Sequence, residues 1–260
     1  WIDQAAFLAD EIGRATGERY EVVRGETWRR RIPGFEVRFG NAALARPRVL
    51  RATACLLDDG RSCAAGTPVT SQPSLRAASG WGRFLRETRG VIALTLEVGG
   101  RPVDVLVTHL DAFAQGEREA QAEHLLERFV DRSRTTILLG DMNAVPAPLV
   151  RPLFPADRTA AILTGGALAD ARSLHAAAGA ARPARGFATF PSNVPLWPLD
   201  WVLGSADLVP ENVATIGGRE SDHRGLYVKF LRGTSPAEPE LPRGVGLHQG
   251  WRSPAPQKPS

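Results

Sequence analysis

The chain has 260 residues, of which 43% are hydrophobic, enough for one large domain or two small ones with a substantial core. No run of about 18 apolar residues occurs, which excludes a membrane-spanning helix. The formal net charge is only +4, so charge alone does not indicate a nucleic-acid-binding protein, although a mildly basic surface suits a polyanionic substrate.

The first fifty residues predict one helix followed by two strands. Asp3 is a suitable N-cap for a helix that ends by Gly17. Strands are predicted over residues 20–23 and 35–39, the second with apolar side chains at alternate positions. Gly40-Asn41 then predicts a turn, which Asn41 would shape rather than contacting substrate.

Residues 58–80 are rich in small and turn-forming residues with no period, which predicts a long surface loop. Cys55 and Cys63 flank the start of this loop. They either form a local disulfide in an exported protein or are two unrelated thiols. The non-Met start and the cysteine pair favour export or the periplasm, with the cytoplasm as the open alternative.

The middle of the chain has the most regular patterns. Residues 91–98 and 103–109 are two strand-like runs around Gly99-Gly100, which predicts a β-hairpin whose second strand ends at His109. Residues 117–130 have the spacing of an amphipathic helix. This helix leads to the short apolar run 136–139, which predicts a buried strand.

That buried strand ends in Gly140, followed by Asp141 and, two residues further on, Asn143. Because alternate residues of an extended chain point to the same face, the carboxylate and the amide are expected to lie together at the end of the strand. A carboxylate can hold hydrated Mg²⁺ or take a proton from water, and an amide can donate to an anionic oxygen.

The last hundred residues predict a helix over 169–178 and a strand over 199–203 that carries Asp200 near its start. The polar run Ser221-Asp222-His223 precedes the last core strand, 226–231. We therefore expect one domain over residues 1–231, followed by a Pro-rich, extended or disordered tail over 232–260.

Six motifs in this order resemble those of the endonuclease/exonuclease/phosphatase superfamily, the deoxyribonuclease I-like fold. They are Gly40-Asn41-Ala42, Glu87-Thr88-Arg89-Gly90, Thr108-His109-Leu110-Asp111, Gly140-Asp141-Met142-Asn143, Leu199-Asp200-Trp201 and Ser221-Asp222-His223. The resemblance implies an α/β (α+β) fold, a four-layer sandwich of two face-to-face mixed β-sheets flanked by helices. It also implies Mg²⁺-dependent hydrolysis of a phosphate ester, with Mn²⁺ as the alternative ion.

The beginning of the chain departs from the family pattern. Members of that superfamily start with a strand bearing an Asn and a second strand ending in Gln-Glu, whose Glu is a metal ligand. The first residues of the present chain resemble the segment that comes after this Gln-Glu strand. Either the chain is trimmed and lacks its first strands, or it is a degenerate member with impaired metal binding. We expect trimming, because the other motifs are intact.

Hydrolysis of a phosphodiester needs an activated water, neutralised phosphoryl oxygens and stabilisation of the leaving oxygen. Asp141 is expected to orient or deprotonate the water, and Asn143 to donate to the phosphate. His109 and His223, if cationic or donating, are expected to bind the non-bridging oxygens. Asp200 matches the family's acid that pairs with a catalytic histidine or positions Asn143; its alternative role is a strand-start cap.

Two further acids are expected near the metal. Asp222 could ligate it directly, and Glu87 would contact His109 or the metal shell and so fix the tautomer of the ring. The alternative for Glu87 is a solvated, charged strand end beside Arg86 and Arg89.

The most specific prediction is a monomeric phosphodiesterase that acts on nucleic acid or on a phospholipid head group. The alternative is a catalytically silent binding module. A nuclease site would have basic and aromatic residues at its rim, and the candidates are Trp81, Arg83, Arg86, Trp197 and Trp201. The same residues could equally pack in the core or meet a lipid surface.

Overall fold

The computed structural model describes residues 3–57, 63–65, 88–144, 157–179, 186–218 and 220–233 of the chain. The elements of the first half are α1 (Gln4–Thr16), β1 (Glu21–Ile32), β2 (Phe35–Ala45), β3 (Val49–Leu56), β4 (Cys63–Ala65), β5 (Gly90–Val98), β6 (Arg101–His109) and α2 (Gln115–Phe129). Those of the second half are β7 (Thr136–Asp141), α4 (Thr159–Thr164), β8 (Leu168–Asp170), α5 (Ala171–Ala177), β9 (Asp200–Ser205), β10 (Leu208–Ile216) and β11 (Gly225–Arg232).

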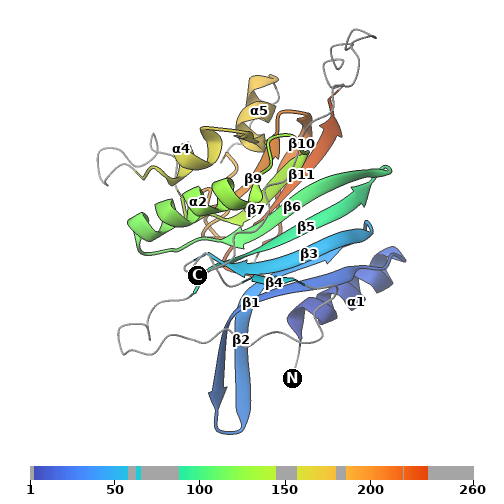
Figure 1. The fold of residues 1–260 in the computed structure, drawn as a ribbon, viewed down its shortest axis with the longest axis vertical. Helices are drawn as coiled ribbons and strands as arrows, with labels where there is room; N and C mark the ends of the chain where they lie inside the picture. The colour runs from blue at the N-terminus through green and yellow to red at the C-terminus, as the bar shows by residue number, and fades with distance from the viewer. Residues whose placement is uncertain are drawn as a thin grey trace, which may run out of the picture.

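Seven strands form one mixed sheet in the order β4-β3-β5-β6-β7-β9-β8 (Figure 1). Within it β6 and β7 run parallel, and the other neighbours are antiparallel. Two further antiparallel pairs, β1–β2 and β10–β11, form separate sheets. The predicted mixed α/β fold is confirmed. No helix among the described residues is both long enough and apolar enough to cross a membrane.

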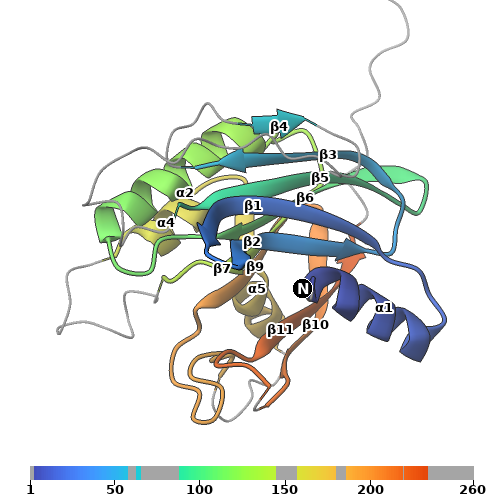
Figure 2. The same cartoon turned by 90° about the horizontal axis from the view of Figure 1, so that it is seen from below.

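The two faces of the seven-stranded sheet are covered differently (Figure 2). On one face, Leu125 of α2 and Leu163 of α4 are fully buried in a core that includes Leu138 of β7. On the other face, the β1–β2 pair covers β3 and β5, where Val23 packs in a second core with Ile92.

Between the two strand pairs, the second face of the sheet is only partly covered. Side chains of β6 and β7 that point towards α2, such as Leu106 and Leu138, are buried, whereas most of those that point away are only partly buried. These partly buried side chains, which we name the apolar strip, are Val105 and Val107, which pack against the second core, and Ile137 and Leu139. The strip lies between β2, which contacts β6, and β11, which contacts β9.

Helix α1 has the ends that its sequence predicts. The side chain of Asp3 accepts a hydrogen bond from the backbone N–H of Ala6 at 3.1 Å. Gly17 adopts the left-handed conformation with φ 74°, and its N–H donates to the carbonyl of Gly13. The helix passes through Gly13 and ends at Thr16.

The predicted turn at Gly40-Asn41 is wrong, because β2 continues through both residues to Ala45. Gly40 is needed for close strand contact instead: a Cβ atom there would lie 2.2 Å from the backbone oxygen of Gly25 in β1. Asn41 uses its side-chain amide to donate to the carbonyl of Gly90 at 2.9 Å, which ties β2 to the start of β5.

The predicted long loop over residues 58–80 lies outside the described residues except at β4. The structure places Cys63 in this short strand, opposite Cys55, and the two form a disulfide. Strands β3, β8 and β10 and helix α4 were not predicted. The predicted last strand is present; none of its residues is fully buried, but Leu226, Val228 and Phe230 pack against a small core of Ala171, Phe187 and Val213.

Gly140 allows β7 to approach β6 closely. It pairs with Thr108 in the parallel ladder and has a φ of 145°, which side chains rarely permit. A Cβ atom built on Gly140 would lie 1.8 Å from the backbone oxygen of Thr108. Any side chain here would therefore force the two strands apart.

We expect Gly140→Ala to lower the free energy of unfolding by about 3 kcal/mol or more, because it combines a backbone clash with an unfavourable φ. Urea denaturation followed by circular dichroism measures this change. The matched control is Gly116→Ala in α2, where no atom lies within 4 Å of the added Cβ, and it should be neutral or stabilise by about 0.5–1 kcal/mol. Equal midpoints for Gly140→Ala and the parent chain would contradict the assignment.

Candidate active site

Three adjacent strands bring three site residues into one row. His109 is the last residue of β6, Asp141 the last of β7 and Asp200 the first of β9. His109 pairs with Asp141 and Asp141 pairs with Asp200, so their side chains project from the same face at neighbouring positions. This is the face of the apolar strip, opposite α2.

A fourth residue, His223, reaches the row from the loop before β11. Its Nδ1 lies 2.8 Å from Oδ2 of Asp200, which is hydrogen-bond distance. Its Nε2 lies 3.8 Å from Oδ2 of Asp141, and Nε2 of His109 lies 3.6 Å from the same oxygen. One carboxylate oxygen of Asp141 is thus within 4 Å of two imidazole rings.

The loop that carries His223 is held by a segment that the sequence analysis did not single out. The N–H of Ser192 donates to the carbonyl of Asp222 at 2.7 Å, and Nε of Arg224 donates to the carbonyl of Ser192 at 2.7 Å. The ring of Phe190 lies 4.9 Å from that of His223, centre to centre. Pro191-Ser192-Asn193 is a turn signal, but only the folded chain places this turn beside His223.

Asn143 lies next to the row but points partly away from it. Its backbone N–H donates to Oδ1 of Asp141 at 2.9 Å, and its side-chain amide donates to the carbonyl of Leu110 at 3.1 Å. Its φ of 48° is left-handed, which Asn tolerates better than most residues. A primary amide has two N–H groups, so one remains for a ligand.

The two histidines have opposite charge preferences. Burial, together with the positive charges of Arg89 and His223, lowers the pKa of His109 from 6.5 to about 4. Burial also opposes the charge on His223, but the hydrogen bond and negative charge of Asp200, together with Asp141, raise its pKa above 6.5. At neutral pH His109 is therefore a neutral donor or acceptor, whereas His223 is more readily protonated than an ordinary histidine.

Asp141 is the carboxylate whose environment most disfavours its charge. Burial and the nearby charge of Asp200 raise its pKa from 3.8 to about 6, although the hydrogen bond from the N–H of Asn143 opposes this shift. A carboxylate with a pKa near 6 is a better proton acceptor at neutral pH than an ordinary aspartate.

Asp141, Asp200 and His223 could also hold a metal ion, since they offer one ligand atom each within 4.8 Å of one another. Two carboxylates suit a hard divalent cation such as Mg²⁺ or Mn²⁺, and the imidazole nitrogen is also a metal ligand. Asp222 is exposed, accepts from the hydroxyl of Ser221 and lies outside this group. Glu87 lies outside the described residues, so its role stays a prediction.

The rim residues suggested by the sequence are placed differently. Trp201 is a core residue, 3% exposed, with its indole N–H donating to the carbonyl of Pro198 at 2.9 Å and Arg172 stacked on its ring. Trp197 is half-buried and pairs with Phe190 through the backbone. The remaining suggestions, Trp81, Arg83 and Arg86, lie outside the described residues.

The model of the endonuclease/exonuclease/phosphatase family matches residues 6–223, and the chain therefore belongs to this family. A comparison with curated protein sequences finds no match.

Solved structures show the same fold at low identity. An endonuclease/exonuclease/phosphatase family protein from Leptotrichia buccalis is 15% identical, with a TM-score of 0.59 over 87% of this chain and 77% of that one. The mannosyl-6-phosphatase of Bacteroides thetaiotaomicron is 14% identical, with a TM-score of 0.53 over 87% and 82%. D. rerio TDP2, complexed with a single-strand DNA product, is 14% identical, with a TM-score of 0.53 over 85% and 81%.

Titration of the ring signals by NMR in metal-depleted protein tests the different environments of the two histidines. We expect His109 to titrate near pH 4 and His223 above 6.5. Asp200→Asn should lower the pKa of His223, since it removes the hydrogen-bonding carboxylate, and should change that of His109 less. Two rings that both titrate near 6.5 would show that the arrangement is wrong.

Proposed function

We propose that the protein is a divalent-metal-dependent phosphodiesterase. The observation that carries this proposal is the convergence of His109, Asp141, Asp200 and His223, from four separate parts of the sequence, at one end of the sheet. Residues so far apart in sequence gather at a strand end most often where a site is built.

The metal would be held by the acids that the sequence suggests, Asp222 and Glu87, with Asp200 as a further carboxylate, which leaves Asp141 free to act as a base. Mg²⁺ is the first choice because the available donors are mainly carboxylate oxygens, and Mn²⁺ is the alternative. When bound, such a cation would neutralise charge on the phosphoryl oxygens.

Asp141 is suited to orient and deprotonate the attacking water. Its Oδ1 accepts from the backbone of Asn143, which fixes the carboxylate, while Oδ2 faces the two imidazole rings. With a pKa of about 6 it is ionised at neutral pH and still basic enough to accept a proton.

His223 is suited to stabilise the developing negative charge. Asp200 accepts from its Nδ1, so the second proton of the imidazolium lies on Nε2, on the side of Asp141. The sequence left two roles open for Asp200, as the partner of a histidine or as a support for Asn143. The hydrogen bond between Asp200 and His223 favours the first role.

His109 and the free N–H of Asn143 would bind the non-bridging oxygens as neutral donors. His109 would act in this way rather than as a cation, because its pKa is about 4. Neutral donors can hold an oxyanion without adding a second positive charge beside His223.

Aromatic side chains flank the histidines and support a diester substrate with a group beyond the phosphate. Phe39 is 40% exposed, 6.4 Å from the ring of His109, and Phe190 lies on the His223 side. An exposed ring such as that of Phe39 can stack on a base or pack against an apolar group. Neighbours with this fold include a mannosyl-6-phosphatase and a protein complexed with DNA product, so the fold alone does not choose the substrate.

Hydrolysis of bis-p-nitrophenyl phosphate with Mg²⁺ tests the proposal. We expect Asp141→Asn and His223→Ala each to lower kcat about 10²- to 10⁴-fold, because each removes a proton-transfer or charge-stabilising group. The control is Asp10→Asn, the same change at an exposed position on α1, which should leave kcat unchanged. Chelation with EDTA should abolish turnover, and Mn²⁺ should restore it.

Retained activity of Asp141→Asn would contradict the assigned base, and activity in EDTA would contradict the metal requirement. Assays of DNA, RNA, sphingomyelin and inositol phosphates side by side then identify the substrate class. A chain that binds one of them but cleaves none with Mg²⁺ or Mn²⁺ would be a binding module instead.

A further inference from the structure

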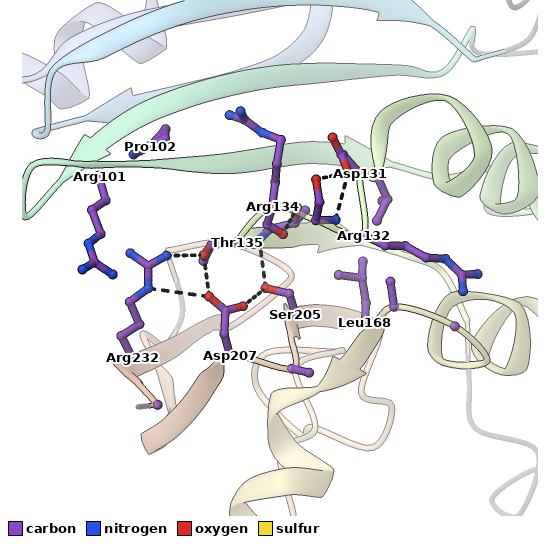
Figure 3. A pocket seen from close by; sticks show the side chains of 17 residues that line it. Arg101, Pro102, Asp131, Arg132, Arg134, Thr135, Leu168, Ser205, Asp207 and Arg232 are labelled. Atoms are coloured by element: carbon purple, nitrogen blue, oxygen red, sulfur yellow. Dashed lines mark hydrogen bonds and ion pairs between the residues drawn. The ribbon is translucent and has the colours of Figure 1, made fainter. Parts of the chain in front are cut away.

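A second pocket lies at the opposite end of the seven-stranded sheet from the active site. It has a volume of about 770 Å³ and is bounded by the β5–β6 turn, the α2–β7 loop, the α4–β8 loop, the β9–β10 turn and the end of β11 (Figure 3). Thr136 lines it and Asp141 lies five residues further along the same strand, which is about 17 Å at 3.3 Å per residue.

The pocket is positively charged. Its lining contains four arginines, Arg101, Arg132, Arg134 and Arg232, against two aspartates, Asp131 and Asp207, which is an excess of two formal positive charges. The active site is lined instead by carboxylates and imidazoles. The two sites therefore favour different ligands.

Two of the arginines already have partners. Arg134 forms an ion pair with Asp104, at 2.7 Å between Nη2 and Oδ1. Arg232 donates to the hydroxyl of Thr135 at 2.7 Å, and its Nε lies 3.6 Å from Asp207. These contacts hold both guanidinium groups at the edge of the pocket and partly neutralise them.

Arg101 and Arg132 are different. Within the described residues, neither guanidinium group forms a hydrogen bond or an ion pair. Both are exposed. Figure 3 shows the guanidinium groups of Arg101 and Arg232 pointing towards one another, and Arg132 on the other side of the pocket with its guanidinium group directed away from them. Like charges that converge in this way repel unless an anion lies between them.

The floor of the pocket is fixed by hydrogen bonds around Asp207. Its carboxylate accepts from the hydroxyls of Ser205, at 2.6 Å, and Thr135, and these contacts lower its pKa although burial opposes them. Ser205 in turn accepts from the backbone N–H of Thr136 at 2.9 Å. Because β7, β9 and the β9–β10 turn are tied together here, the arginines surround a rigid base.

Apolar side chains form the remaining walls. Val130, Ala167 and Leu168 line the side near α2 and α4, and Pro102 lines the side of the β5–β6 turn. A volume of this size, with charged groups around an apolar wall, suits a small molecule rather than a long polymer.

We propose that this pocket binds a small phosphorylated molecule that also carries an apolar or aromatic group, such as a nucleoside diphosphate. The guanidinium fork matches phosphate oxygens with paired N–H groups, and Arg101 and Arg132, which form no ion pair with the described residues, supply these groups without breaking the ion pairs of Arg134 and Arg232. The excess charge of the lining matches a diphosphate, and the apolar wall would receive the base. The site is separate from the active site and does not depend on its chemistry.

Isothermal titration of the full chain with ADP, in metal-depleted buffer so that no divalent ion supports turnover, tests this proposal. We expect one ADP per chain, and no binding of adenosine, which lacks the charge. Arg101→Glu and Arg132→Glu should each weaken ADP binding about tenfold or more, because each replaces a phosphate donor by a repelling charge. Both side chains are exposed, so the melting temperature should not change.

Two controls separate this site from general charge effects and from the active site. Arg19→Glu makes the same charge change at an exposed residue between α1 and β1 and should leave the affinity within twofold. His223→Ala should do the same. The proposal is overturned if the parent chain shows no saturable ADP binding, if Arg19→Glu weakens binding as much as Arg101→Glu, if His223→Ala abolishes it, or if adenosine binds equally well.

Discussion

The close parallel pairing of β6 and β7 is the constraint on which the active site depends. A ladder in register sets the side chains of His109 and Asp141 about one strand spacing apart, roughly 4.8 Å, and β9 adds Asp200 on the other side. Gly140 permits the approach, since any Cβ there would meet the backbone of Thr108. The glycine before Asp141 is therefore part of the site although it has no functional group of its own.

The same pairing explains why chemically identical side chains behave differently. His109 and His223 both face one oxygen of Asp141, yet His109 is buried beside Arg89 and His223 is bonded to Asp200. Burial without a hydrogen-bonded carboxylate favours the neutral ring, whereas the hydrogen bond to Asp200 favours the cation. The opposite pKa shifts of the two rings thus follow from where each ring lies, His109 at the end of β6 and His223 in the loop before β11, rather than from residue type.

Sequence patterns predicted the features that depend on local chemistry and missed those that depend on long-range contact. The β5–β6 hairpin follows from Gly99-Gly100 and strand β7 from its apolar run, so Asp141 and His109 could be placed at strand ends. The turn predicted at Gly40-Asn41 is wrong, because Gly40 instead allows β1 and β2 to approach closely. Strand β10 was not predicted, because Pro210 and a register irregularity interrupt the alternating pattern of a strand.

The position of the active site follows from how the second face of the sheet is covered. Val105 and Val107 of β6 and Ile137 and Leu139 of β7 are only partly buried, and the next residues on the same faces of these strands are His109 and Asp141. The apolar strip and the active site are therefore one continuous surface between β2 and β11. Fully covering the strip would stabilise the fold by about 25 cal/mol for each Å² of apolar surface removed from water. Whatever covers it would also form a wall of the active site, so stability and access to substrate are linked in this part of the molecule.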